Sequence, residues 1–145
     1  MAKLTSSDLT ILAELADEGF RITKLRKAII QLITQLEKPF SIDEIRHLLK
    51  KQGIAVHRWS LYREMEFLTR FNVLSPVIFH DGVVRYEVVT GNHHHHLICL
   101  KCDLVEDVEL KQELEEEERR IARKTKFQII RHSLEFFGLC ANCRS

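Results

Sequence analysis

Two pairs of closely spaced cysteines constrain the fold of this chain more than any other feature of its sequence. Cys99 and Cys102 form the first pair, Cys140 and Cys143 form the second, and 37 residues separate the two pairs. Four thiolates in two such pairs are ligands that tetrahedral Zn²⁺ favours, and together they fill its coordination sphere. The spacing therefore predicts a structural zinc ion that ties an internal segment to the end of the chain.

Spacing alone leaves two alternatives open for these cysteines: a pair of redox-active disulfides, or an iron–sulfur cluster. The N-terminal residues 1–10 lack the apolar core of a signal peptide, which predicts a cytoplasmic protein. In that compartment, free cysteines indicate metal or redox chemistry rather than a disulfide framework. No apolar run approaches the roughly 20 residues that a membrane helix needs, so no membrane partner is expected.

Charge is distributed unevenly along the chain, although the formal net charge is only +1. Residues 20–63 contain ten Lys or Arg against three Asp or Glu, whereas residues 90–145 contain nine against ten. A basic segment next to a neutral one is typical of a nucleic-acid-binding half followed by a partner-binding half. The alternative is that these basic residues form solvent-exposed helix faces and bind no nucleic acid.

Capping residues and apolar periodicity predict helices at residues 6–17, 23–37, 41–53 and 58–71. Ser6 or Ser7 is expected to cap the first helix, whose apolar stripe is Leu9, Leu12, Ala13 and Ala16. Thr23 is expected to cap the second, and Ser41 with Glu44 forms a capping box for the third.

The pattern after residue 71 predicts a β-hairpin. Two β-rich segments, 73–80 and 83–89, flank Asp81-Gly82, the strongest short hairpin signal. Packed helices followed by a hairpin are typical of a winged helix, whose last helix enters the major groove of DNA. That helix directs polar residues outward, namely Arg58, Ser60, Tyr62, Arg63 and Glu66. A winged helix that binds protein instead of DNA remains an alternative.

A hinge is predicted at residues 90–92, which divides the chain into domains 1–89 and 90–145. Strands are expected at 94–101, 104–108 and 127–137 of the second domain, and a helix at 110–124. The predicted fold class is therefore α+β, with a winged-helix domain followed by a small α/β domain. Because a core this small is marginal, a metal or a partner subunit is expected to stabilise it.

Four consecutive histidines at residues 93–96 are the second strong signal. Successive side chains of a strand point to opposite faces, so His94 and His96 are predicted to face one way and His93 and His95 the other. Imidazole suits iron, zinc, cobalt or nickel, and a nearby carboxylate completes such a site. The candidate carboxylates are Glu87, Glu106 and Asp107. Alternation with Ile130, Leu134 and Phe136 favours a core position for His132.

Four stretches together resemble the ferric uptake regulator family of bacterial metal-dependent repressors. They are residues 19–26, 60–63, 93–102 and 132–143, and their order along nearly the whole chain is more specific than any one of them. The resemblance implies a homodimeric, metal-activated repressor of double-stranded operator DNA rather than an enzyme. Its expected targets are genes of metal uptake or of metal and oxidative stress, with an iron response favoured.

The resemblance also implies roles for individual residues. The structural zinc ligands are Cys99, Cys102, Cys140 and Cys143. The regulatory metal ligands are Glu87, His94, His96 and Asp107. A second metal site in the dimerisation domain comprises His93, His95, Glu115 and His132, with His95 where the family usually has Asp. The DNA contacts are Arg21, Tyr62 and Arg63, which join Arg58 and Ser60 from the outward face of the fourth helix.

Departures from the family pattern leave the regulatory metal and the operator open. Pro39 replaces a His ligand that many relatives have, and His47, His57 and His80 are the candidate substitutes. Asp107 resembles the residue found in the peroxide-sensing branch of the family. Arg63 and Glu87 resemble the iron-uptake branch, and the histidine run is similar to that of zinc-uptake regulators. Fe²⁺ is the favoured regulatory ion, with Mn²⁺ and Zn²⁺ as alternatives. Trp59 is unusual before Ser60, which predicts a different operator preference.

Two rival functions belong to other classes. A zinc hydrolase needs three ligands and a bound water, but the sequence contains no nucleophile elbow, no H-E-x-x-H motif and no Gly-rich phosphate loop. A zinc buffer or metal chaperone needs no DNA, and it leaves Arg21, Tyr62 and Arg63 without a role.

Overall fold

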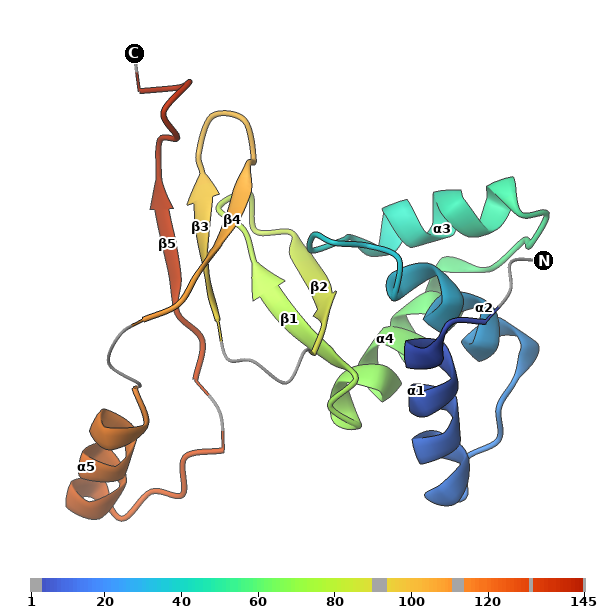
Figure 1. Cartoon of the computed structure of the whole chain (residues 1–145), viewed down its shortest axis with the longest axis horizontal. Coiled ribbons are helices and arrows are strands. Elements are labelled where there is room, and N and C mark those ends of the chain that lie inside the picture. The colour runs from blue at the N-terminus through green and yellow to red at the C-terminus, as the bar shows by residue number, and fades with distance from the viewer. Residues whose placement is uncertain (1–3, 90–93, 111–113, 131, 145) are drawn as a thin grey trace. The chain divides into compact units, whose positions relative to one another are not determined.

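The computed structural model describes residues 4–89, 94–110, 114–130 and 132–144 (Figure 1). The chain divides into two compact units, Met1–Val89 and Thr90–Ser145, and each is described by itself. Both units combine helices with a small antiparallel or mixed sheet, so the predicted α+β class is confirmed. Within the described ranges, no helix is both long enough and apolar enough to cross a bilayer.

The first unit has the predicted order of four helices and a hairpin. Its elements are α1 (Ser6–Asp17), α2 (Lys24–Ile33), α3 (Ile42–Lys51), α4 (Arg58–Arg70), β1 (Leu74–Ile78) and β2 (Val84–Val88). Thr23 caps α2 as predicted, because its hydroxyl accepts the backbone N–H of Arg26. Helix α2 ends at Ile33, however, four residues before the predicted end.

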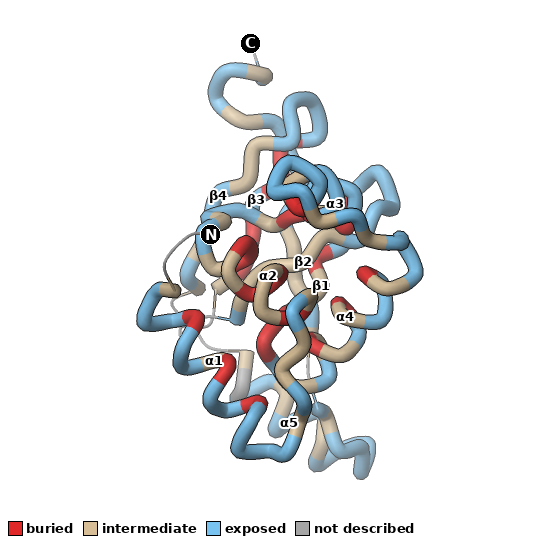
Figure 2. The backbone as a smooth tube through the Cα atoms, turned by 90° about the vertical axis from the view of Figure 1, so that its right-hand side faces the viewer, coloured by how far each residue is buried: buried red, intermediate tan, exposed pale blue. Residues whose placement is uncertain are grey.

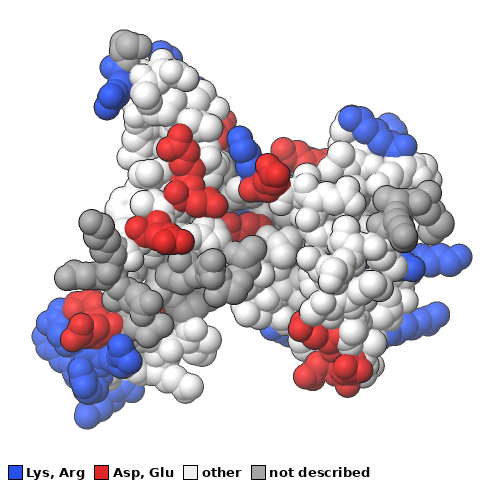
Figure 3. Space-filling model, viewed as in Figure 1, with Lys and Arg blue, Asp and Glu red and all other residues white. Residues whose placement is uncertain are grey.

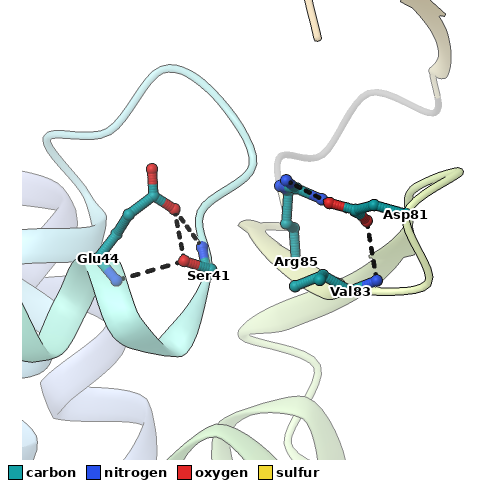
Figure 4. A network of polar contacts seen from close by, with 5 residues as sticks. All are labelled: Ser41, Glu44, Asp81, Val83 and Arg85. Atoms are coloured by element: carbon teal, nitrogen blue, oxygen red, sulfur yellow. Dashed lines mark hydrogen bonds and ion pairs between the residues drawn. The ribbon is translucent and has the colours of Figure 1, made fainter. Parts of the chain in front are cut away.

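The capping box at the start of α3 is confirmed. The Ser41 hydroxyl accepts the backbone N–H of Glu44 at 3.3 Å, and the Glu44 carboxylate accepts the backbone N–H of Ser41 at 2.6 Å (Figure 4). These two bonds satisfy donors that a helix otherwise leaves unpaired at its N-terminus.

The prediction for α1 was wrong about its cap and its buried face. Thr5 is the N-cap, and it forms a capping box with Asp8. Asp8 is buried because its other carboxylate oxygen accepts the hydroxyl of Thr34 at the end of α2. The buried residues of α1 are therefore Asp8, Leu12 and Leu15, whereas Leu9, Ala13 and Ala16 are exposed. A partner for a buried carboxylate cannot be recognised from apolar periodicity.

The core of the first unit lies between the helices and the hairpin (Figure 2). Helices α2, α3 and α4 supply fully buried residues at helical spacing: Ile29, Ile33, Ile45, Leu49, Leu61, Met65 and Leu68. Backbone bonds between Phe40 and Tyr86, both 2.8 Å, attach the segment before α3 to β2. Burying these apolar side chains, at roughly 1.5–3 kcal/mol each, stabilises the winged-helix arrangement.

The hairpin closes where it was predicted. Strands β1 and β2 pair antiparallel up to Ile78 and Val84. Gly82 adopts a φ of 73°, a left-handed conformation that glycine tolerates without steric strain. The Asp81 carboxylate accepts the backbone N–H of Val83 at 2.8 Å and two bonds from the Arg85 guanidinium (Figure 4). The basic residue nearest the hairpin tip is therefore paired within the hairpin.

In its described residues, the second unit consists of a three-stranded sheet and one helix. Its elements are β3 (His95–Cys99), β4 (Val105–Val108), α5 (Glu115–Thr125) and β5 (Glu135–Gly138). The strand order is β4-β3-β5, with β3 antiparallel to β4 and parallel to β5.

Two boundaries in the second unit differ from the prediction by more than two residues. The described helix begins at Glu115 instead of Leu110, and residues 111–113 lie outside the description. The last strand begins at Glu135 instead of Phe127. Ile130 is 89% exposed, so the expected alternation of buried residues around His132 is wrong. An alternating pattern makes a strand only where a neighbouring strand pairs with it, and β3 pairs only from Glu135 onward.

Candidate metal sites and DNA-binding helix

Strand pairing brings the two cysteine pairs together. Cys99 ends β3, where it pairs with Gly138 at the end of β5, two residues before Cys140. All four sulfur atoms lie within 4.8 Å of one another. The Cys102 and Cys140 sulfurs are 3.8 Å apart. Four sulfurs bound at about 2.3 Å around a tetrahedral ion are separated by about 3.8 Å, whereas a disulfide needs about 2.05 Å. The donor set fits structural zinc.

The electrostatics of the cluster also fit a cation. The backbone N–H groups of Cys140 and Lys101 donate to the Cys99 sulfur and lower the pKa of its thiol to about 6. The Cys143 thiol donates to the sulfurs of Cys140 and Cys102, which raises its pKa to about 12. Adjacent thiolates repel one another, so the four groups do not ionise together without a compensating charge. A divalent metal supplies that charge and displaces the remaining protons.

The described histidines of the run, His94 to His96, point to two sides of the strand that forms β3. The rings of His94 and His96 have centroids 5.1 Å apart, and His96 Nε2 lies 3.9 Å from a carboxylate oxygen of Asp107. His96 and Asp107 are directly paired residues of β3 and β4. Glu106, the other carboxylate candidate on β4, pairs with Leu97 and therefore faces the opposite side. His96 therefore lies next to two other predicted regulatory ligands, His94 and Asp107.

The opposite face of β3 brings His95 next to His132. Their ring centroids are 5.7 Å apart, and His95 Nδ1 lies 3.2 Å from the backbone oxygen of Leu134. His132 Nδ1 lies 2.6 Å from a carboxylate oxygen of Glu118 on α5. His93 and the side chain of Glu115, the other predicted members of this site, lie outside the description.

Glu118 is a residue that the sequence analysis did not single out. The available signal was the run of four glutamates at 115–118, in which the first and last are separated by almost one helical turn. Sequence spacing alone therefore predicts one helix face for the two ends of this run, and it makes either end a candidate partner for an imidazole. Only the packing of α5 identifies Glu118 as the neighbour of His132.

The remaining regulatory candidates belong to the first unit. Glu87 is a half-buried residue of β2 that pairs with Ser75. Pro39 is half-buried just before α3. The candidate substitutes for the missing His ligand are all exposed: His47 on α3, His57 at the N-cap of α4, and His80 in the hairpin loop.

Helix α4 has a buried face and an exposed polar face. Leu61, Met65 and Leu68 are buried, whereas Arg58, Tyr62 and Arg63 are exposed and Ser60 is half-buried. Arg58 Nη2 pairs with Asp43 of α3 at 3.0 Å, and its guanidinium carbon lies 5.6 Å from the Tyr62 ring. In the part of the chain that the structure describes, no carboxylate pairs with Arg63. Its charge is available to an anion.

Basic side chains project from both units (Figure 3). In the first unit they extend from α3, and in the second they mix with glutamates on α5. One residue of the basic segment, however, is buried. Arg26 donates from Nε and Nη2 to the two carboxylate oxygens of Glu64 on α4, and its guanidinium lies 3.7 Å from the Phe67 ring. Arg26 therefore contributes to structure rather than to the surface charge.

Arg26 also holds the segment that contains Arg21. Its Nη1 donates to the backbone oxygen of Arg21 at 2.8 Å. One buried guanidinium thus links a predicted DNA-contacting residue to the helix with the other predicted contacts. Arg21 itself is exposed.

We expect Arg26→Ala to lower the free energy of unfolding by about 3 kcal/mol, because it leaves the Glu64 carboxylate without its bidentate partner. Arg70→Ala is the matched control, since it removes an exposed pair with Glu66 on the same helix and should cost at most about 0.5 kcal/mol. Urea denaturation monitored by circular dichroism measures both. Equal losses in the two variants would contradict the structural role of Arg26.

The sequence model of the ferric uptake regulator family matches residues 17–137, which is most of the chain. The chain belongs to this family. The ferric uptake regulation protein of Bacillus subtilis is 31% identical over 134 residues, covering 90% of this chain and 89% of that protein. Members of this family are regulators that respond to metals and repress transcription. The predicted class of function, a metal-responsive transcriptional repressor, is therefore confirmed.

Other relatives cover the same length. The peroxide-responsive repressor PerR of Staphylococcus aureus is 27% identical over 133 residues, covering 92% of this chain and 88% of that protein. The solved structure of the Helicobacter pylori ferric uptake regulator, which reveals three functional metal binding sites, aligns with a TM-score of 0.75 at 25% identity. The alignment covers 100% of this chain and 98% of the Helicobacter pylori chain. The family resemblance therefore extends over both units.

Proposed function

We propose that this member of the ferric uptake regulator family is a cytoplasmic homodimer that represses transcription when a divalent metal binds Glu87, His94, His96 and Asp107. The observation that supports this most is the grouping of His94 and His96 with Asp107 across β3 and β4. Two imidazoles with carboxylates are a ligand set for Fe²⁺, Mn²⁺ or Zn²⁺. We favour Fe²⁺, because the chain is similar to proteins that are named for the regulation of ferric uptake.

The ligands flank the boundary between the two units, and this position suggests how they act. Glu87 lies three residues before that boundary, and His94 and His96 follow shortly after it. Shared ligation of these side chains restrains the segment between them and therefore the direction of the DNA-binding unit. In a dimer, that restraint favours recognition helices spaced for successive major grooves, about 34 Å apart. A metal that binds more tightly to the DNA-competent conformation than to other conformations shifts the protein toward that conformation.

We assign the other predicted residues to supporting roles. Cys99, Cys102, Cys140 and Cys143 hold a structural zinc ion that stabilises the second unit. His93, His95, Glu115 and His132 form a second metal site, with Glu118 as a further candidate ligand. Arg21, Arg58, Ser60, Tyr62 and Arg63 contact DNA from the first unit.

The deciding experiment is a titration of operator affinity with Fe²⁺ under anaerobic conditions, and with Mn²⁺ and Zn²⁺. We expect at least one metal to raise the affinity about 5- to 150-fold, the usual range of coupling between two sites. A change below about threefold with every metal would exclude metal activation. Metal binding without any salt-dependent DNA binding would instead support a zinc buffer or metal chaperone.

Peroxide sensing through bound iron is a second candidate function. Asp107 favours it, as does the similarity to a peroxide-responsive repressor. If it is correct, hydrogen peroxide releases the Fe²⁺-loaded protein from the operator but leaves the Mn²⁺-loaded protein bound. If the Fe²⁺-loaded and Mn²⁺-loaded proteins both stay bound to the operator in hydrogen peroxide, the result would favour the iron-uptake function.

Arg63 and Tyr62 are expected to differ in their effects on DNA binding. Arg63→Ala should weaken binding to operator and random DNA alike, and it should reduce the slope of log affinity against log salt by about 1. Tyr62→Ala should reduce the preference for operator, because its ring contacts a base edge. Binding isotherms at four salt concentrations measure both effects. An equal loss on both DNAs for Tyr62→Ala would reject its role in base recognition.

A further inference from the structure

Trp59 is an exposed aromatic residue on α4 to which neither the metal sites nor the proposed DNA contacts give a role. It is the second residue of the helix and the only tryptophan of the chain. It is 71% exposed, more than any other large hydrophobic residue among residues 4–89. An indole that remains in contact with water forfeits the favourable free energy of burial. Its exposed surface is therefore available for contact with a partner.

The surroundings of Trp59 fix its ring on the outward face of α4. Tyr62 and Arg63 follow it by three and four residues, so the three side chains lie on one face of the helix. The Trp59 and Tyr62 rings meet edge to face, with centroids 6.1 Å apart and an interplanar angle of 84°. The buried residues of the helix, Leu61 among them, occupy the other side. The indole is thus held away from the core.

The charge around this face favours DNA over a protein as the partner. Arg58 and Arg63 lie on either side of the aromatic pair in sequence, and both are exposed. The segment from residue 20 to residue 63 has a large excess of basic residues. Such a surface attracts phosphate groups, and phosphate contacts bring the helix into the groove without selecting a sequence. An apolar ring at its centre is then positioned at the base edges.

We propose that Trp59 is a specificity-determining residue that contacts thymine methyl groups in the major groove of the operator. This inference rests on the proposed DNA-binding function. The N-terminal residues of a recognition helix are those that contact base edges, and Trp59 lies in the first turn of α4. Among base edges, only thymine presents a methyl group in the major groove, and apolar side chains recognise it. The operator therefore contains a thymine opposite the start of α4.

The single tryptophan makes a direct test of contact available. Trp59 is the only tryptophan of the chain, so emission excited at a wavelength that Tyr62 and Tyr86 do not absorb reports on Trp59 alone in the metal-loaded protein. We expect operator DNA to quench or shift this emission, and random DNA at the same salt concentration and saturation to change it less.

Removing thymine methyl groups tests specificity. Each operator thymine is replaced in turn by uracil, which lacks only the methyl group, and affinity is measured for the unaltered protein, Trp59→Ala, Trp59→Phe and Leu9→Ala. We expect the unaltered protein to lose about fivefold or more at one or two thymines, within the range of a single base mismatch. Trp59→Ala should be insensitive at those thymines, and Trp59→Phe partly sensitive. Leu9→Ala, a control at a 53% exposed residue of α1, should behave as the unaltered protein does.

The outcomes separate the inference from the proposed function. If the unaltered, metal-loaded protein does not bind its operator, the proposed function fails. If it binds, but Trp59→Ala keeps the same sensitivity to uracil, the inference is wrong and the exposed indole serves another partner. An equal loss by Trp59→Ala on operator and random DNA also overturns it, because it indicates a non-specific contact. Circular dichroism and thermal unfolding of Trp59→Ala should match those of the unaltered protein, since the side chain is outside the core.

Discussion

Cys102→Ser is expected to remove the zinc from the protein and to unfold the second unit. Cys102 is exposed, so the substitution itself disturbs no packing and its effect reports on metal binding. Structural zinc sites bind with an apparent free energy of about 10–16 kcal/mol, which becomes folding free energy when no site exists in the unfolded chain. That amount is comparable to the whole stability of an ordinary domain, about 5–15 kcal/mol. Elemental analysis, circular dichroism and sedimentation measure zinc, folding and dimerisation.

Lys101→Ala is the matched control for this experiment. Lys101 is the exposed neighbour of Cys102 in the same turn, and its side chain is not part of the cluster. This variant should keep about one tightly bound zinc ion per chain through its four cysteines, together with the stability of the unaltered protein. A Cys102→Ser protein that stayed a zinc-free dimer with unchanged thermal unfolding would disprove the structural role of the site.

His96→Ala is expected to abolish the effect of metal on operator binding, whereas His95→Ala should retain most of it. The two residues are neighbours on β3, and each is 4% exposed, so their removal disturbs packing to a similar extent. His96 lies beside His94 and Asp107, while His95 lies beside His132. The measured quantity is the ratio of operator affinity with and without metal. It should fall to about 1 in His96→Ala from the 5- to 150-fold expected of a coupled site.

The histidine comparison has its own controls. Metal stoichiometry, measured on both variants, should fall in each, because each removes a ligand from a different site. Melting temperatures of the metal-free variants should be similar. If the affinity ratio falls equally in both, the two faces of β3 do not form separate sites, and the assignment of His94, His96 and Asp107 to regulation would be wrong.

Several predictions that rest on local signals are confirmed, although the N-cap of α1 and the end of α2 were predicted wrongly. The capping box of Ser41 and Glu44 and the hairpin at Asp81-Gly82 depend on residues a few positions apart. Strand alternation, likewise local, separated His95 from His94 and His96. Such features are fixed by backbone geometry and neighbouring side chains, which the sequence displays directly.

Predictions that depend on a distant partner failed or were missed. Asp8 is buried because Thr34 donates to it, and Arg26 is buried because Glu64 and Phe67 receive its guanidinium. Apolar periodicity treats both residues as surface charges. The last strand is shorter than its alternating pattern because β3 pairs with it only from Glu135. Glu118, not singled out, lies beside His132 because of how α5 packs.

The sequence by itself determined the helices and hairpin of the first unit, the two cysteine pairs whose four sulfurs lie together, and the separation of His95 from His94 and His96. Spacing and periodicity encode these features, because each depends on the geometry of a short segment or on the chemistry of its donors. Only the tertiary structure decided which charges are buried, where the last strand begins and which glutamate reaches His132. These outcomes depend on whether a remote group compensates the cost of removing a polar group from water, and sequence spacing does not contain that information.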